Sequence, residues 1–196
     1  MTSPDIERWN RKHTARGVER IPPAPTLTEW REALGSGGRI LDAAGGRGRH
    51  ARYLASEGFD VTLCDASPVA IDLAQAMAQE DGLELEGLVR DLEVDGWPPG
   101  RYDGILVVHF LHRPLFVDVE NHLEPGGWFL FIHPTKRNLE RHSKPSARWL
   151  LDEGEGHALL KASGLTLVQE DESWGASGRH EYRVLARRNT PPLAEG

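Results

Sequence analysis

The stretch RILDAAGGRGRHARYLASEGFDVTLCD, residues 39–65, decides the fold of this chain. It opens with a short apolar run at 39–44 and continues with the glycines Gly45, Gly46 and Gly48. Helical spacing of apolar side chains follows at 49–57. This order indicates a strand, a tight turn and a helix.

The second half of the stretch returns the chain to the sheet. Gly58 predicts the end of the helix, and the apolar run at 61–64 predicts a second strand that delivers Asp65 at its carboxyl end. The whole is a β-α-β unit with a right-handed crossover. Glycines let the backbone approach a ligand, and a carboxylate about 20 positions later can accept both hydroxyls of a ribose. The stretch therefore predicts an adenosine cofactor, with Asp65 at its ribose.

Two cofactors fit this pattern. The spacing Gly46-x-Gly48-x-x-Ala51 satisfies the dinucleotide fingerprint. Asp42, at the end of the first strand, is not part of that fingerprint and matches instead the acidic residue of the Asp/Glu-x-Gly-x-Gly-x-Gly motif found in class I S-adenosylmethionine-dependent methyltransferases, which this stretch resembles. Ala44 replaces the first glycine of that motif, a change that costs little if φ there is negative.

Composition limits the classes of function. The chain has 196 residues, which suits one domain, and its 30 acidic against 23 basic residues give a net charge of −7. That charge disfavours a nucleic-acid partner held through phosphates. Cys64 is the single cysteine and is expected to be a buried apolar residue without a disulfide. With no signal peptide and no apolar run near about 20 residues, a cytoplasmic protein without a membrane partner is expected.

Residues 1–38 are predicted to hold two helices and a connector. Ser3 is expected to cap the first helix, which either packs on the domain or forms a flap whose Trp9 and Arg11 or His13 close over the cofactor. A proline-rich connector follows at 21–25. A second helix is expected at 26–35, with Thr26 and Glu29 as a capping box.

Alternation of helices and strands continues after Asp65. We expect further strands at 85–90, 102–109 and 128–132, and helices at 68–80, 115–123 and 155–163. A turn is expected at 124–127, and the polar segment 133–148, with Lys136, Arg137 and Arg141, is a candidate substrate loop. Strands at 165–172 and 179–187 should form an antiparallel hairpin, and 189–196 should be a flexible tail.

The fold class expected from this order is α/β, a Rossmann-like open sheet that is mostly parallel, with a C-terminal antiparallel hairpin and helices on both faces. Residues 39–188 resemble small bacterial class I methyltransferases, including tellurite-resistance-type and thiopurine-type relatives. The matching segments are LDAAGGRGRHA at 41–51, Asp65, DLE at 91–93, WP at 97–98 and LHRP at 111–114.

This resemblance implies a cofactor site for S-adenosylmethionine. Asp42 and the Gly46/Gly48 turn would hold the methionine end of the cofactor. Ala44 and His50, which belong to the same motif, would also bind the cofactor. Asp91 and the backbone of Leu92 would meet the adenine, whose ring would lie between Ala66 and Leu92. His109 and Phe110 would lie beside the sulfonium. Asp91 has a second interpretation as a helix or turn cap.

The acceptor side of the site carries no motif. His109, His112 and Arg113 are the candidate catalytic residues, because the fourth strand should deliver them next to the transferable methyl group. His112 and Arg113 could instead cap a helix or pair with an acidic neighbour. A metal site at His109, His112 and His133 is not expected, because these residues lack the spacing of known zinc sites.

Three functions remain open from the sequence. The leading one is a methyltransferase that acts on a small molecule, as a monomer or homodimer. The others are a small NAD(P)-binding oxidoreductase, against which Asp42 and the C-terminal hairpin argue, and a non-catalytic S-adenosylmethionine-binding protein.

Overall fold

The computed structural model describes residues 1–190, so the expected tail at 189–196 lies outside the described residues from 191 onward. Within residues 1–190, no helix is both long and apolar enough to cross a membrane. The helices and strands are α1 (Ser3–Arg16), α2 (Pro25–Glu29), η1 (Arg31–Leu34), β1 (Arg39–Ala43), α3 (Arg49–Ser56), β2 (Asp60–Asp65), α4 (Pro68–Glu80), β3 (Glu86–Val89), α5 (Leu92–Asp95), β4 (Tyr102–Val108), α6 (Pro114–Asp118), η2 (Val119–His122), β5 (Leu123–Pro134), η3 (Lys136–Glu140), η4 (Ala147–Trp149), α7 (Glu155–Ala162), β6 (Thr166–Trp174) and β7 (His180–Arg187).

The strands form one seven-stranded sheet in the order β3-β2-β1-β4-β5-β7-β6. β1 pairs with β2, and β2 with β3, in parallel, whereas β7 pairs with β5 and with β6 in antiparallel orientation. The expected fold class, a mostly parallel Rossmann-like sheet with an antiparallel C-terminal hairpin, is confirmed. By its internal contacts the chain divides into two compact units, which are described separately.

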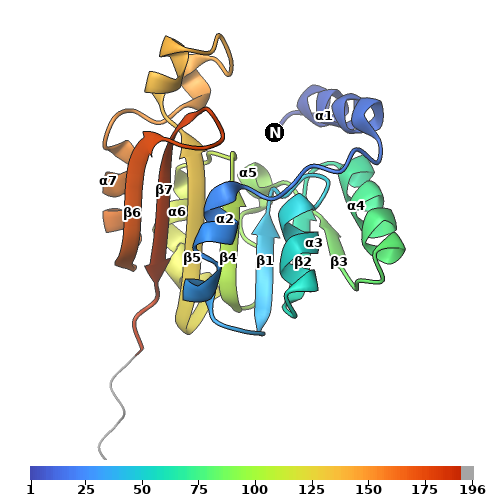
Figure 1. Ribbon diagram of the computed structural model, residues 1–196, viewed down its shortest axis with the longest axis horizontal. Helices are drawn as coiled ribbons and strands as arrows, with labels where there is room; N and C mark the ends of the chain where they lie inside the picture. The colour runs from blue at the N-terminus through green and yellow to red at the C-terminus, as the bar shows by residue number, and fades with distance from the viewer. Residues whose placement is uncertain (191–196) are drawn as a thin grey trace, which may run out of the picture. The chain divides into compact units, whose positions relative to one another are not determined.

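Unit 1 comprises Met1–Pro98 and Leu106–Phe110. Its helix α3 buries Ala51 and Leu54, and its helix α4 buries one stripe that ends at Met77 and Ala78. Cys64 is buried in β2 and free, as expected for a small core residue. α1 packs against α4, on the side toward which β1 points (Figure 1). The carboxyl ends of the parallel strands and α1 are therefore close together in this unit.

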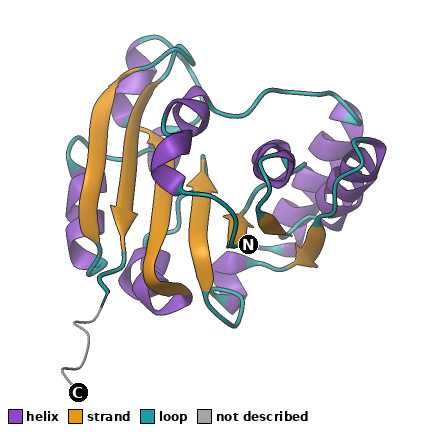
Figure 2. Ribbon diagram, turned by 60° about the horizontal axis from the view of Figure 1, so that its bottom comes forward, coloured by secondary structure: helices purple, strands orange, loops and turns teal. Residues whose placement is uncertain are grey.

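Unit 2 comprises Pro99–Ile105 and the chain from Leu111 onward. Its long strands β6 and β7 run side by side (Figure 2). Phe116 meets the rings of Phe129 and Phe131 edge-on, with centroids 5.7 and 4.8 Å away. α7 approaches β7 closely because Gly156 has no side chain, and a Cβ there would lie 2.2 Å from the Tyr182 ring. Aromatic packing thus fixes the core of this unit.

Three local predictions differ from the structure. α1 is capped by Thr2, which forms a capping box with Asp5, and not by Ser3. The capping box predicted at Thr26 and Glu29 is wrong, because α2 begins at Pro25 without a side-chain cap and ends at Glu29. The turn predicted at 124–127 is also wrong, since these residues belong to β5.

Candidate functional site

The turn between β1 and α3 depends on its glycines. A Cβ on Gly45 would lie 2.5 Å from the Asp42 carboxylate, and one on Gly48 would lie 2.9 Å from Ala74. Gly46 and Gly48 also have positive φ angles of 57° and 67°. No larger residue fits either contact, so the backbone of this turn can lie directly against a ligand.

Ala44 lies in the same turn with φ at +54°. The condition under which this alanine would cost little, a negative φ, is therefore not met, and the alanine stands where a glycine would be relaxed. Left-handed backbone costs an alanine about 1 to 2 kcal/mol. The turn keeps this strain, which is the kind of local cost that proteins retain at functional sites.

Asp65 fastens the turn from the end of β2. Its Oδ2 accepts the backbone N–H of Gly46 at 2.9 Å, and its Oδ1 accepts that of Ser67 at 2.9 Å. Burial raises the pKa of Asp65, while these backbone hydrogen bonds act to lower it. Each carboxylate oxygen keeps a further lone pair, so both can still accept a hydroxyl.

Asp42 lies under the turn and is fully buried. Its Oδ2 accepts the backbone N–H of Ala51 at 3.0 Å, which satisfies one of the free donors in the first turn of α3. Its Oδ1 is buried without a hydrogen-bond partner among residues 1–190. Burial raises the pKa of Asp42 to about 7. In this structure Asp42 therefore supports the turn and keeps one free acceptor atom.

A hollow opens beside this turn, entirely within unit 1. Its cavity volume is about 120 Å³, below the range of roughly 300 to 1,000 Å³ typical of enclosed small-molecule sites, and the hollow is open to solvent. Its lining residues come from the turn, from the ends of β2, β3 and β4, and from α1. They are Met1, Trp9, His13, Ala44, Gly46, Asp65, Ala66, Arg90, Asp91, Leu92, His109 and Phe110.

Most of the predicted cofactor residues are thus brought together. Asp42, Gly48 and His50 are exceptions, because they are buried behind the turn and do not line the hollow. His50 has a buried Nε2 without a partner in residues 1–190. Burial lowers the pKa of His50 well below its usual value, and the neighbouring Arg49 and His109 lower it further. His50 is therefore a neutral imidazole that interacts electrostatically with His109.

His109 has an unusual backbone at the end of β4. Its φ is +60°, and Ala44 is the only other non-glycine residue in the described chain with a positive φ. Both residues line the hollow. Because backbone strain of this kind gathers at functional sites, its location supports the hollow as the site.

Asp91 performs two tasks at the far end of the hollow. Its Oδ1 accepts the backbone N–H of Glu93 at 3.0 Å and so caps the short helix α5. Its Oδ2 accepts a hydrogen bond from the Met1 ammonium. The alternative interpretation of Asp91 as a helix cap is therefore observed, and the same residue also lines the hollow.

α1 supplies lining residues that the cofactor motifs did not assign. Trp9 and His13 line the hollow, whereas Arg11 is largely exposed and lies beside Glu7. Trp9 and His13 are four residues apart, which places both on one face of the helix. This spacing is the sequence signal that indicates both as lining residues. Arg90, at the end of β3, carried no such signal.

His112 and Arg113 belong to unit 2 and are not among the residues that line the hollow. The Arg113 guanidinium forms a two-point ion pair with Glu155 at the start of α7, with Nη2 and Oε2 3.0 Å apart. This hydrogen bonding raises the pKa of Arg113. The alternative that Arg113 pairs with an acidic neighbour is therefore observed.

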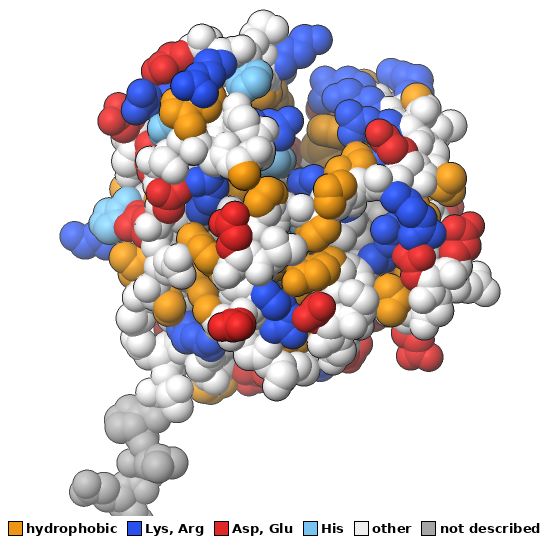
Figure 3. Space-filling view, viewed as in Figure 1, with side chains coloured by type: hydrophobic (Ala, Val, Ile, Leu, Met, Phe, Trp, Pro, Cys, Tyr) orange, Lys and Arg blue, Asp and Glu red, His pale blue; other side chains and the backbone are white. Residues whose placement is uncertain are grey.

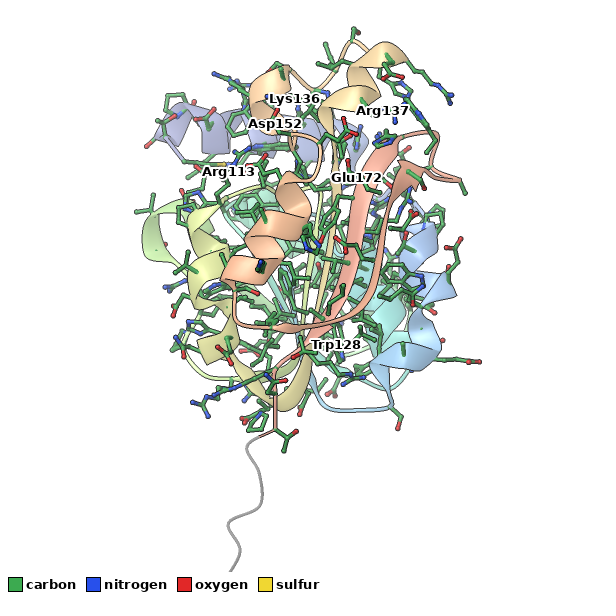
Figure 4. All side chains as sticks on the ribbon, turned by 90° about the vertical axis from the view of Figure 1, so that its left-hand side faces the viewer. Arg113, Trp128, Lys136, Arg137, Asp152 and Glu172 are labelled. Atoms are coloured by element: carbon green, nitrogen blue, oxygen red, sulfur yellow. The ribbon has the colours of Figure 1, made fainter. Side chains whose placement is uncertain are left out.

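The segment at 133–148 is bonded to residues that follow it in the chain. His133 belongs to β5 and its Nε2 lies 2.8 Å from the carbonyl oxygen of Trp149. Lys136 and Asp152 point toward one another and form an ion pair (Figure 4). Arg141 lies over the Trp174 ring at 3.8 Å. Within residues 1–190, no three His, Cys, Asp or Glu side chains are grouped to hold a metal ion.

Comparison with known proteins identifies a domain within the chain and its fold. Residues 40–127 match the family model of a methyltransferase domain. No curated protein sequence matches the chain significantly. In structure the chain is similar to TehB from Haemophilus influenzae, with a TM-score of 0.71 and 18% identity over 85% of this chain and 63% of that one. The chain thus spans less than two thirds of that protein.

Two further solved structures match nearly end to end. One is a TehB-like SAM-dependent methyltransferase from Corynebacterium glutamicum, with a TM-score of 0.62 and 23% identity over 95% of this chain and 97% of that one. The other is the N-methyltransferase NodS from Bradyrhizobium japonicum, with a TM-score of 0.67 and 18% identity over 96% and 99%. The domain match at residues 40–127 and the shared fold support a class I methyltransferase domain with S-adenosylmethionine as its cofactor.

Proposed function

We propose that this protein transfers a methyl group from S-adenosylmethionine to a small-molecule acceptor. The observation that carries the proposal is the position of Asp65. Its carboxylate accepts the N–H of Gly46 at 2.9 Å and lies on the wall of the hollow. A carboxylate beside a glycine turn, at the end of the second strand, is the arrangement that binds the ribose of adenosine cofactors.

The residues present fit the three parts of this cofactor. Ala66 and Leu92 offer apolar surface for the adenine, and Asp91 offers an acceptor. Asp65 offers lone pairs to the ribose hydroxyls. At the methionine end, Asp42 is proposed to act through the turn that it supports from below, because its side chain is fully buried.

The cofactor, when bound, supplies a methyl group that is already activated by its sulfonium. The protein must then position a lone-pair donor and exclude water, which can contribute several kcal/mol to the rate. His109 is the proposed base because it lines the hollow, and an imidazole can accept a proton near neutral pH. His112 and Arg113, which follow His109 after Phe110 and Leu111, are proposed to contact the acceptor.

The acceptor class is inferred from charge. A net charge of −7 disfavours a nucleic-acid substrate, which supports a small molecule. We propose that the protein works as a monomer or a homodimer, without a nucleic-acid or membrane partner. The comparisons do not choose between sulfur, nitrogen, oxygen and heavier chalcogen acceptors.

A methyl-acceptor screen tests this function. The purified protein would be incubated with S-adenosylmethionine and thiols, amines, phenols or chalcogen oxyanions, and formation of S-adenosylhomocysteine would be measured. The proposal expects product formation that depends on one acceptor class. Tight cofactor binding without turnover for any acceptor would instead favour a non-catalytic binding protein, and binding of NADH in place of the sulfur cofactors would favour an oxidoreductase.

A further inference from the structure

The His13 imidazole lies over the glycine turn. Its Cε1 is 3.4 Å from the position that a Cβ on Gly46 would take. The ring is stacked on Trp9, with centroids 5.8 Å apart and planes inclined by 25°. Both side chains line the hollow. α1 therefore supplies part of the wall directly beside the turn that would hold the methionine end.

One polar atom of this ring is not accounted for. His13 Nδ1 is buried and has no hydrogen-bond partner among the described residues. Burial lowers the pKa of His13 to about 4, and the nearby charges of Arg47, Arg16 and Lys12 contribute, so the imidazole is neutral at pH 7. A buried ring nitrogen without a partner costs about 1 to 3 kcal/mol. A ligand in the hollow that bonds to Nδ1 would remove this cost.

α1 is held in place by residues of the cofactor site. Ser67, whose N–H donates to Asp65, donates its hydroxyl to Asn10 Oδ1 at 2.5 Å. Arg47, inside the glycine turn, donates to the carbonyl oxygen of Gly17 at 2.7 Å, just beyond the end of α1. The position of His13 is therefore set by side chains from the segments that would bind the cofactor.

The charge around His13 is positive. Lys and Arg side chains gather over α1 (Figure 3), and Lys12, Arg16 and Arg47 are close enough to affect the imidazole. Such surroundings favour a negatively charged ligand group. The cofactor carries one anionic group, the carboxylate of its methionine end.

We propose that His13 is a cofactor-binding residue, whose Nδ1–H donates a hydrogen bond to the methionine carboxylate of S-adenosylmethionine. The proposal rests on the proposed function. It assigns the methionine carboxylate to His13, which lines the hollow, while Asp42 supports the adjoining turn from below. His13, with Trp9, would then help to distinguish the complete cofactor from fragments that lack the amino acid.

Two ligands separate this role from a general effect of α1. S-adenosylhomocysteine contains the amino-acid end, and 5′-methylthioadenosine does not. Calorimetry would compare both ligands on the parent, on His13→Ala, on His13→Asn and on Arg11→Ala, a matched change at an exposed position of the same helix. His13→Ala should weaken S-adenosylhomocysteine about tenfold or more and leave 5′-methylthioadenosine within about twofold of the parent.

His13→Asn keeps a short N–H donor and should recover part of the loss, and Arg11→Ala should change neither affinity. Equal losses for the two ligands in His13→Ala, or no loss for either, would overturn the assignment while leaving the proposed function intact. A parent protein that binds neither ligand would instead overturn the proposed function, and the assignment with it.

Discussion

Asp65 and Gly46, 19 residues apart in the chain, are joined by a 2.9 Å hydrogen bond from the glycine N–H to the aspartate carboxylate. The bond connects the end of β2 to the turn after β1. The other carboxylate oxygen of Asp65 accepts the backbone N–H of Ser67, at the start of α4. One side chain thus fixes the wall of the hollow and still offers acceptor atoms to it.

Replacing Asp65 tests the ribose assignment. Asp65→Ala should weaken S-adenosylhomocysteine binding by roughly 2 to 4 kcal/mol, because two charge-assisted hydrogen bonds to the ribose are lost. The protein should still fold, at a lower Tm, since Gly46 and Ser67 lose an acceptor. Calorimetry measures the affinity, with Asp60→Ala at the exposed start of β2 as the control. An affinity equal to that of the parent would mean that Asp65 does not bind the ribose.

The strained turn predicts a substitution that raises the free energy of unfolding. Ala44→Gly removes an alanine with positive φ, which should stabilise the fold by about 1 to 2 kcal/mol. The greater backbone freedom of glycine in the unfolded chain offsets about 0.5 to 1 kcal/mol of this stabilisation. The free energy of unfolding should therefore rise by up to about 1 kcal/mol, with cofactor affinity retained. Urea unfolding measures the change. Ala55→Gly, within α3, should instead lower stability by about 1 kcal/mol, and a similar drop for Ala44→Gly would refute the strain.

Asp42 predicts a pH dependence of stability. Its pKa rises from about 3.9 in the unfolded chain to about 7 in the fold, so the native state binds the extra proton between these values. Its contribution is therefore fully present below pH 4 and is lost as pH rises to 7, with a slope of about 1.4 kcal/mol per pH unit. Asp42→Asn should remove this loss.

The stability of Asp42→Asn relative to the parent should improve by about 1 to 3 kcal/mol between pH 5 and pH 8. Urea unfolding at both pH values gives the comparison. A difference between the two proteins that stays constant with pH would show that Asp42 titrates in the fold as it does in the unfolded chain.

The acceptor side needs a test that separates catalysis from packing. His112→Ala and Arg113→Ala should each lower turnover with an identified acceptor about tenfold or more, while cofactor affinity changes little, because these residues are proposed to act on the nucleophile. Glu155→Gln breaks the observed ion pair with Arg113 and serves as the control. If Arg113→Ala only repeats the Glu155→Gln loss of Tm and leaves turnover unchanged, Arg113 is a structural partner of α7.

Local patterns predicted much of this fold. The turn was predicted from Gly45, Gly46 and Gly48, and Asp65 was predicted at the end of β2. A turn and a strand end both depend on short stretches of sequence. The continuation of β5 through 124–127 did not follow from a Glu-Pro-Gly-Gly segment. There the chain stays extended because Gly126 and Gly127 exchange backbone hydrogen bonds with Arg188, about 60 residues away.

The site was predictable to a similar degree. Asp65, Asp91 and His109, predicted at strand ends, line the hollow, since parallel strands end at a common edge. The burial of Asp42 depends on how α3 returns over β1, and the positive φ of Ala44 depends on the shape of the turn. Neither property is visible in residue types alone. The free Nδ1 of His13 likewise exists only because α1 packs beside the turn.

The central claim is that the hollow beside Gly46 and Asp65 binds S-adenosylmethionine. The most direct measurement is isothermal titration of the full chain with S-adenosylmethionine, S-adenosylhomocysteine and NADH under the same conditions. We predict that both sulfur compounds bind with dissociation constants on the order of micromolar and that NADH does not bind. Tight binding of NADH without binding of either sulfur compound would contradict the account.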